Sequence, residues 1–512
     1  MNVGAKIEFG DFQTPLDLAA DVCALLKSLG VQPNTIIEPT CGTGAFLAAA
    51  ARAFPQAQLL GLDINADYVA QAKTALKTAH TEHRSKVQTQ DFFSHDWAAE
   101  VAKAGGNLLI LGNLPWVTNS TVERLEGSNL PVKDNFMGLR GIAARTGKAN
   151  FDISEWMLIQ LVKALRGRKA WLAMLCKTAT ARKLLRFAWQ NDGRIAEAFL
   201  YRIDAKKHFS ASVDACLLVA HTGTNGPVEA AVFNDLASAK PDVKIGLAGK
   251  DLVADLRTYR RLRNFEGLCT YQWRSGVKHD CASVMELWRN SGGKMRNKLG
   301  EEVELEPDYL FPLLKCSDLA NSRTKPERWL LLTQRQVGED TSRIAHVAPK
   351  TWRYLNRHHA LFKARKSSIY NKRADFSVFG VGDYAFAPWK VAVSGLHCNP
   401  VFVLLGSYEG KPLLLDDTCY FLSFDNKAEA QVVAKILNSA PGREFLSALV
   451  FEDAKRPVTV ELLQRLNLRE IAGAAGLAEG WEKTAEKFPS TQPQEEMVQG
   501  LMLMETPRKG KK

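Results

Sequence analysis

The sequence predicts a doubly wound, Rossmann-like α/β sheet with an antiparallel edge strand, followed by a C-terminal mixed α+β domain. From residue 16 to residue 221, segments with helical spacing alternate with short apolar runs, as in a parallel sheet covered by helices. The alternation ends at Thr222–Pro227, whose Gly and Pro residues indicate a linker. At 512 residues the chain is also too long for one ordinary core, so at least two domains are expected.

Each element of the first half has its own local signal. Leu16–Gly30 has helical spacing and a Gly stop, and Asn107–Gly112 is apolar throughout, as in a strand covered on both faces. The last two strands have no helix between them, which predicts an antiparallel pair at the edge. Strands are expected at Thr35–Glu38, Leu59–Ile64, Val87–Asp91, Asn107–Gly112, Lys169–Cys176, Glu197–Ile203 and Ala215–His221, and helices at Leu16–Gly30, Gly44–Phe54, Ala66–Ala79 and Phe151–Leu165.

The rest of the chain is less regular. We expect the α/β domain at residues 1–225, the mixed domain at 226–480 and a polar, disordered tail at 481–512 that ends in basic residues. Residues 117–150 have no clear period, which indicates a functional or disordered loop.

Composition narrows the class of protein. The net charge of +12 favours a polyanionic partner, because bound Lys and Arg release counterions from phosphates. The nine cysteines show no CxxC spacing, so neither a zinc site nor a disulfide framework is expected, and a reducing, cytoplasmic location fits best. No apolar segment is long enough for a signal peptide or a membrane span, so no membrane partner is expected.

A Gly-rich turn between the first strand and the next helix indicates a cofactor site. It comprises Glu38, Pro39, Thr40, Cys41, Gly42, Thr43 and Gly44, and glycines there allow a ligand to approach the backbone. Asp63 ends the next strand, 25 residues after Glu38, at the distance typical of a carboxylate that holds a ribose diol. Asp91 and Phe92 end the third strand and suit an adenine ring. The turn lacks the third glycine of a dinucleotide site, which argues against NAD.

These motifs resemble the DNA N6-adenine family of class I S-adenosyl-L-methionine-dependent methyltransferases, over residues 11–220. The resemblance places Thr14 and Pro15 near the methionine part of the cofactor, Glu38, Cys41, Gly42 and Gly44 in its Gly-rich motif, Asp63 and Ile64 at the ribose, and Asp91 and Phe92 at the adenine. The motif order is that of the gamma arrangement. The resemblance implies S-adenosyl-L-methionine as the cofactor, residues 1–225 as the catalytic domain, and a prokaryotic cell in which the protein is associated with the nucleoid.

The tetrapeptide Asn113-Leu114-Pro115-Trp116 follows the fourth strand and resembles the family's catalytic motif, with Leu114 in place of a proline. The Asn113 side-chain oxygen and the Leu114 carbonyl could accept both N–H groups of a base amine and free its lone pair for methylation. Trp116 offers a flat face to an extruded base. Phe209 resembles the family's second stacking aromatic, and Asn150-Phe151-Asp152 resembles a further motif at a helix start.

The second half is interpreted as a DNA target-recognition domain. Residues 323–373 hold thirteen Lys or Arg and three Asp or Glu, interleaved with aromatic residues, a composition suited to a DNA backbone. Segments 273–280 and 376–396 resemble target-recognition domains of restriction–modification methyltransferases. The expected contacts to double-stranded DNA are Arg353, Arg357, Lys363, Arg365 and Lys366.

Several alternatives stay open. Related tetrapeptides serve cytosine N4, RNA bases and protein glutamine, and Leu114 is the one feature that favours an inactive DNA-binding subunit. Pro241-Asp242, Pro307-Asp308 and Glu409-Gly410-Lys411 do not assemble into a nuclease motif along the chain, so no nuclease is expected. A separate restriction endonuclease remains a conceivable partner, and the oligomeric state is left open.

Overall fold

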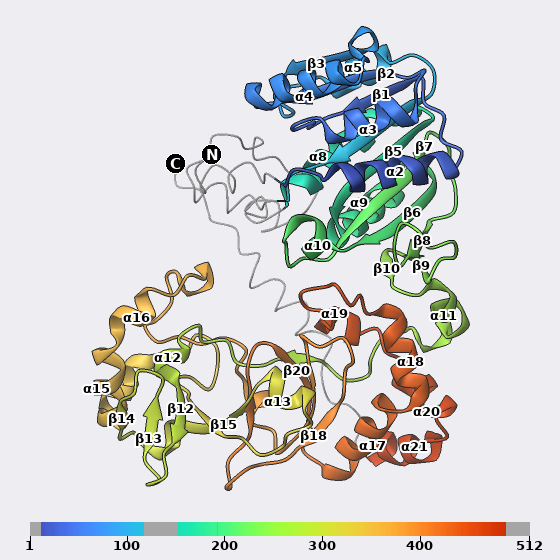
Figure 1. The fold of residues 1–512 in the computed structure, drawn as a ribbon. Helices are drawn as coiled ribbons and strands as arrows, with labels where there is room; N and C mark the ends of the chain where they lie inside the picture. Colours follow the sequence, from blue (N-terminus) through green and yellow to red (C-terminus); the bar gives the residue numbers. More distant parts are fainter. Residues whose placement is uncertain (1–11, 117–151, 192, 488–512) are drawn as a thin grey trace, which may run out of the picture. The chain divides into compact units, whose positions relative to one another are not determined.

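The computed structural model describes residues 12–116, 152–191 and 193–487, which form two compact units that meet in the sequence between Arg257 and Thr258 (Figure 1). Outside the described residues lie the expected loop 117–150, the first two residues of the motif Asn150-Phe151-Asp152, and residues 488–512 of the expected tail. Among the helices that are described, none has both the length and the hydropathy of a membrane span.

The first unit is built on one large sheet whose strand order is β3-β2-β1-β4-β5-β7-β6-β8-β9-β10. Strands β1 to β5 pair in parallel, as expected, so their carboxyl ends meet at one edge. The doubly wound α/β class is therefore confirmed. The strands are β1 (Thr35–Glu38), β2 (Gln58–Asp63), β3 (Ser85–Thr89), β4 (Leu108–Asn113), β5 (Ala170–Lys177), β6 (Ile195–Ile203), β7 (Ala215–Thr222), β8 (Glu229–Phe233), β9 (Val243–Ala248) and β10 (Asp251–Val253).

The antiparallel strand lies inside this sheet. β7 pairs antiparallel with both β5 and β6, so the predicted antiparallel pair exists, but its expected position at the edge is wrong. β8 pairs in parallel with β6 and continues the sheet toward β10. The segment 222–227, expected as a linker, therefore joins two strands of the same sheet, and the first unit runs to Arg257.

Helices cover both faces of the sheet and bury its apolar strands. Four of them match the expected ones, namely α2 (Leu16–Ser28), α3 (Ala45–Ala53), α4 (Ala66–Thr78) and α8 (Ile153–Ala164). The helices α5 (Trp97–Lys103) and α9 (Thr178–Gln190) were not predicted, and α10 (Ala205–Phe209) lies where a loop was expected. The Asp204 side chain caps α10 by accepting from Lys207 N.

The second unit is a mixed α+β domain, as expected, and its strands form two separate sheets. The first sheet has the order β11-β20-β17-β18, and the second has the order β14-β13-β12-β16-β15-β19. Their strands are β11 (Arg274–Ser275), β12 (Glu286–Arg289), β13 (Met295–Asn297), β14 (Glu302–Val303), β15 (Leu310–Leu314), β16 (Arg328–Leu331), β17 (Trp389–Ser394), β18 (Val403–Leu405), β19 (Leu414–Leu415) and β20 (Cys419–Phe424).

The helices of the second unit are short except near its end. They include α11 (Leu256–Arg261), which spans the boundary, α15 (Pro349–Arg357), α16 (His359–Lys363), α17 (Lys427–Leu437), α18 (Ala440–Leu449), α20 (Leu468–Ala474) and α21 (Ala478–Lys487). The start of α21 falls before residue 481, where the tail was expected to begin. Trp481 is buried beside Tyr271, with ring centroids 6.1 Å apart, so this part of the expected tail packs as a helix.

Candidate active site

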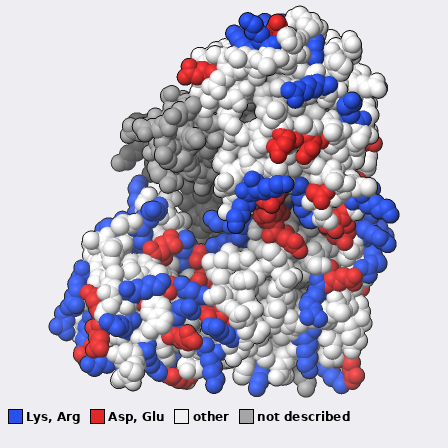
Figure 2. Space-filling view, viewed as in Figure 1, with Lys and Arg blue, Asp and Glu red and all other residues white. Residues whose placement is uncertain are grey.

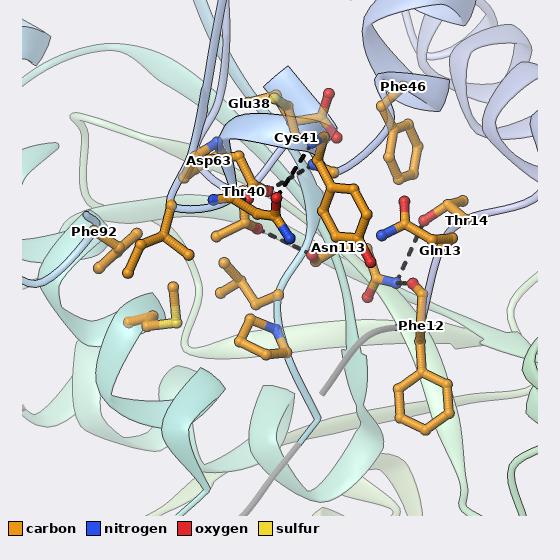
Figure 3. A pocket seen from close by; sticks show the side chains of 18 of the residues that line it. Phe12, Gln13, Thr14, Glu38, Thr40, Cys41, Phe46, Asp63, Phe92 and Asn113 are labelled. Carbon is orange, nitrogen blue, oxygen red and sulfur yellow. Dashed lines mark hydrogen bonds between the residues drawn. The ribbon is translucent and has the colours of Figure 1, made fainter. Parts of the chain in front are cut away.

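One cavity lies at the carboxyl ends of β1, β2 and β4 and next to the residues that follow β3 (Figure 3). Its empty volume is about 1000 Å³, including the open mouth. Most of the predicted cofactor and catalytic residues line it together, namely Thr14, Glu38, Cys41, Gly42, Asp63, Ile64, Asp91, Phe92, Asn113, Leu114 and Pro115. Residues that lie far apart in the sequence are thus brought to one place. The lining also includes residues that were not predicted as site residues, among them Asn65, Tyr68, Phe93 and Met157.

The Gly-rich turn has two glycines with different roles. Gly42 has a φ of 50°, and a Cβ there would lie 2.6 Å from Gln13 Oε1, so a side chain would crowd the cavity wall. Gly44 has a φ of 88°, and a Cβ there would lie 2.8 Å from the Ala72 Cβ. Gly44 therefore allows α3 to pack against α4 and does not line the cavity.

Asp63 is held by the backbone around it. Its Oδ2 accepts from Gly42 N at 2.8 Å, and its Oδ1 accepts from Asn65 N at 2.8 Å. Each carboxylate oxygen has a second lone pair, so the group retains capacity for ligand hydroxyls. These two bonds join the Gly-rich turn to the end of β2, which fixes the carboxylate in the cavity wall.

Glu38 is a buried carboxylate that forms no ion pair with any cation among the described residues. It is 3% exposed, and its Oε2 has no hydrogen-bond partner within the described part of the chain. Burial raises the pKa of Glu38 well above its usual value, the nearby Asp63 raises it further, and a hydrogen bond from the Leu47 backbone opposes the rise. A buried acceptor of this kind suits a ligand that brings a hydroxyl or ammonium donor.

Asp91 and Phe92 lie just beyond β3, which ends at Thr89 rather than at Asp91. Asp91 Oδ1 accepts from Phe93 N at 3.0 Å, and the Phe92 carbonyl accepts from Trp97 Nε1 at 3.0 Å. The Phe92 ring also packs on Trp97, with centroids 4.6 Å apart. Both residues are therefore fixed at the end of the cavity where an adenine was expected.

Asn113 is the last residue of β4, and hydrogen bonds at its Nδ2 fix the orientation of its side-chain amide. Its Nδ2 donates to the Phe12 carbonyl at 3.1 Å and to Thr14 Oγ1 at 3.3 Å, while Thr40 Oγ1 donates to the Asn113 carbonyl at 3.1 Å (Figure 3). The Asn113 Oδ1 is buried and has no partner among the described residues. The site therefore presents one fixed acceptor beside the cavity.

Trp116 and Phe209 contact each other, although they are 93 positions apart in the sequence. Their ring centroids lie 4.9 Å apart in an edge arrangement, and Phe12 lies 5.5 Å from Trp116. Trp116 is 5% exposed and Phe209 is 9% exposed, and neither is among the described lining residues of the cavity. Pro15, the N-cap of α2, also lies outside that lining.

The predicted DNA contacts in residues 323–373 include four exposed cations and one that is partly buried. Arg353, Arg357, Lys363 and Lys366 are exposed, and Lys363 forms an ion pair with Asp375 at 2.8 Å. Arg365 is partly buried, because it donates to the Ser377 carbonyl at 2.7 Å and stacks 3.6 Å from the Tyr370 ring centroid.

Most aromatic residues of this region contribute to the core of the second unit. Trp329, Tyr354 and Phe362 are core residues of the second unit. On the face in Figure 2, Lys and Arg stand among Asp and Glu instead of forming an unbroken positive surface. Core packing therefore accounts for most of the interleaved aromatics, whereas Tyr370 stacks on Arg365.

Comparison with known proteins identifies the family, although no family model matches the chain. The chain is 43% identical over 471 residues to the type II methyltransferase M.NspV of Nostoc sp. (strain ATCC 29411 / PCC 7524), covering 91% of this chain and 98% of that protein. It is 27% identical over 127 residues to the type II methyltransferase M.CvrRI of Paramecium bursaria Chlorella virus XZ-6E, covering 25% of this chain and 29% of that protein.

A solved structure extends the likeness of fold to both units. The type IIL restriction-modification enzyme MmeI, determined in complex with DNA, matches 99% of this chain and 80% of that chain with a TM-score of 0.53 and 12% identity. The predicted cofactor, S-adenosyl-L-methionine, is confirmed by the relationship to M.NspV, and so is the prediction of a DNA methyltransferase. The chain belongs to the type II DNA methyltransferases of restriction–modification systems.

Proposed function

We propose that this chain methylates the N6 amine of an adenine rotated out of double-stranded DNA. The observation that carries the proposal is the Asn113 side chain, whose Nδ2 is held by Phe12 and Thr14 and whose buried Oδ1 has no partner among the described residues. A fixed acceptor beside the cofactor cavity suits an exocyclic amine, which can donate two hydrogen bonds.

The residues of the cavity fit S-adenosyl-L-methionine. The backbone at Gly42 leaves room for close approach of a ligand. The Glu38 Oε2, which has no partner in the part of the chain that the structure describes, and the Asp63 carboxylate offer acceptors for hydroxyl or ammonium groups. Asp63 and Ile64 would hold the ribose, Asp91 and Phe92 the adenine, and Thr14 and Pro15 the methionine part. When bound, the cofactor supplies an electrophilic methyl group.

Asn113 and Leu114 activate the target nitrogen in this proposal. An exocyclic amine is a poor nucleophile because its lone pair is delocalised into the ring. Two acceptors, the Asn113 Oδ1 and the Leu114 carbonyl, would hold the two N–H groups so that the nitrogen lone pair leaves conjugation with the ring. The methylated nitrogen is cationic and acidic, so it then loses one of its two protons to solvent. The bonds from Asn113 Nδ2 keep the amide from rotating, so it presents its oxygen and not its donors.

Trp116 and Phe209 provide the aromatic wall for the extruded base. A base cannot be methylated at this amine inside a stacked duplex, so it has to leave the helix, and stacking repays part of that cost. Because the two rings contact each other at 4.9 Å, the base would take its place by displacing one ring from the other. Trp116 ends the tetrapeptide and lies two positions after the acceptor Leu114, which places its ring near the reacting amine in this proposal.

The second unit reads the DNA sequence in this proposal. The exposed Arg353, Arg357, Lys363 and Lys366 are suited to phosphate contacts, and the net charge of +12 supports a polyanionic partner. The similarity of fold to MmeI, which was determined with DNA, supports the same role. A separate restriction endonuclease is the partner expected in such a system.

The test is methylation of plasmid DNA prepared from a methylation-deficient host, with labelled S-adenosyl-L-methionine followed by nucleoside analysis. We expect N6-methyladenine with the wild type and a loss of kcat of about 10³-fold with Asn113→Ala, since removing one transition-state hydrogen bond has effects of this order. Cofactor affinity should be retained. N4-methylcytosine would overturn the adenine assignment, and no transfer to DNA by cofactor-bound wild type would favour an inactive DNA-binding subunit.

A further inference from the structure

Lys177 contacts both the catalytic tetrapeptide and the helix beyond it. It ends β5, which pairs with β4 in the register Asn113↔Leu175. Its Nζ donates to the Trp116 carbonyl at 3.0 Å and to Asp152 Oδ2 at 2.6 Å. Lys177 was not predicted from the sequence, where it stands as a single cation after an apolar strand.

The carboxylate partner of Lys177 is itself anchored. Asp152 is the N-cap of α8, and its Oδ1 accepts from Ser154 N at 3.1 Å and from the Ser154 hydroxyl. The side chains of Lys177 and Asp152 are only 22% and 10% exposed, so solvent screens their ion pair weakly. Lys177 thereby connects the Trp116 carbonyl to a rigid helix end.

Hydrogen bonds to backbone carbonyls hold the tetrapeptide at both of its ends. Thr40 holds the carbonyl of Asn113, and Lys177 holds the carbonyl of Trp116. Leu114 lies between them, at the position where a proline would have restricted the backbone by its own ring. The carbonyl of Leu114 therefore depends on external contacts for its position.

We propose that Lys177 is a positioning residue for methyl transfer, which fixes the Leu114 carbonyl and the Trp116 ring through its bond to the Trp116 carbonyl and its ion pair with Asp152. This inference rests on the proposed function, because it concerns the acceptors assigned there. Misplacement of reacting groups by about 1 Å can reduce a rate about 100-fold, so a contact that does not touch the base can control kcat.

Lys183 offers a matched control. It lies on α9 and forms an ion pair with Glu155 on α8, the same helix that Lys177 reaches. Lys183→Met and Lys177→Met each remove one Lys–carboxylate pair to α8, but only Lys177 contacts the tetrapeptide. Effects on stability alone should therefore appear in both variants.

The experiment compares wild type, Lys177→Met, Lys177→Arg and Lys183→Met as full chains on unmethylated plasmid DNA. We measure kcat, KM for S-adenosyl-L-methionine, cofactor affinity by calorimetry and Tm. We expect Lys177→Met to lose about 10- to 100-fold in kcat with cofactor affinity unchanged within about two-fold. Lys177→Arg should recover most of kcat, and Lys183→Met should lower Tm while keeping kcat within about two-fold of wild type.

The possible outcomes separate the two proposals. A wild type that methylates no base would overturn the proposed function, and this inference with it. An active wild type with equal kcat in Lys177→Met and Lys183→Met would overturn the inference alone. If Lys177→Met does not fold, Asp152→Asn removes the ion pair but keeps an acceptor for the cap; it should lower kcat with little change in KM, and wild-type kcat would contradict the positioning role.

Discussion

Two buried glutamates, one in each unit, have opposite surroundings. Glu286 is 1% exposed, and it contacts Lys315, His279 at 3.5 Å and Lys298 at 3.7 Å. Burial alone would raise its pKa, but the bonds from His279 and Lys315 outweigh burial and lower the pKa to about 2. Glu38 is equally buried, yet its charged neighbour is Asp63, and its pKa is raised.

This difference distinguishes a carboxylate that stabilises the fold from a carboxylate that is suited to binding a ligand. A buried carboxylate with its own cations is compensated by the fold and contributes to the unit that holds it. A buried carboxylate beside a second carboxylate, at the carboxyl ends of parallel strands, is compensated only when a ligand supplies donors. Glu286 thus belongs to the framework of the second unit, and Glu38 belongs to the cofactor site of the first.

The largest expected effect concerns Glu286. Glu286→Gln should lower the free energy of unfolding by about 3 kcal/mol at pH 7, because it leaves the partly buried Lys315 without its counter-charge. The pKa of Glu286 is lowered from 4.5 to about 2, so its contribution is present above pH 4.5 and is lost as pH falls toward 2. Urea unfolding at several pH values measures this. Unchanged stability at pH 7 would remove the contrast with Glu38.

The next effect concerns Asp63. Asp63→Ala should weaken S-adenosyl-L-methionine binding by about 1.5–3 kcal/mol, since it removes charge-assisted bonds to the ribose and frees the Gly42 N–H. DNA binding should survive. Calorimetry measures the affinity, and Asp67→Ala, an exposed carboxylate four residues on, is the control. Equal cofactor affinity in Asp63→Ala and wild type would show that the ribose is held elsewhere.

Glu38→Gln should have a smaller and opposite effect on stability. Because the pKa of Glu38 is raised in the folded state, the wild type loses stability as pH rises from 4.5 through that raised value. The glutamine is neutral throughout, so the cofactor-free variant should be more stable than wild type by about 1 kcal/mol at pH 8, with the difference vanishing below pH 4.5. Thermal unfolding without cofactor measures this. A variant less stable than wild type at pH 8 would place a compensating donor beside Glu38.

The smallest effect concerns single exposed cations of the second unit. Arg353→Ala and Arg357→Ala should each weaken DNA binding modestly and lower the salt-dependence slope by about one unit, as expected for a lost phosphate contact. Binding to plasmid fragments at several salt concentrations measures the slope. The control is Arg365→Ala. It should lower the stability of the fold, because the Arg365 guanidinium donates to the Ser377 carbonyl and stacks on the Tyr370 ring. Unaltered slopes for Arg353 and Arg357 would place the DNA-binding surface elsewhere.

Much of the first unit was predictable because its signals are local. The strand Thr35–Glu38 matches β1 at both ends, since Pro33 and Asn34 precede an apolar pair and the Gly-rich turn follows it. α9 was missed, although its buried positions recur at helical spacing. β7 lies inside the sheet because it inserts between β5 and β6, and β6 is in turn covered by β8. The local pattern around β7 could not indicate these pairings, because they join strands that are distant or later in the chain.

By itself, the sequence determined the alternation of β1 to β5 with helices, the Gly-rich turn and the acceptors at the strand ends, because periodicity and turn chemistry act over a few residues. Only the tertiary structure decided which polar groups are compensated. Lys315 reaches Glu286 across 29 positions, and Lys177 reaches Trp116 across 61. Burial and partners of this kind are set by strand pairing and helix packing. They distinguish Glu38, the last residue of β1, from Glu286, the first residue of β12, although both glutamates adjoin apolar residues in the sequence.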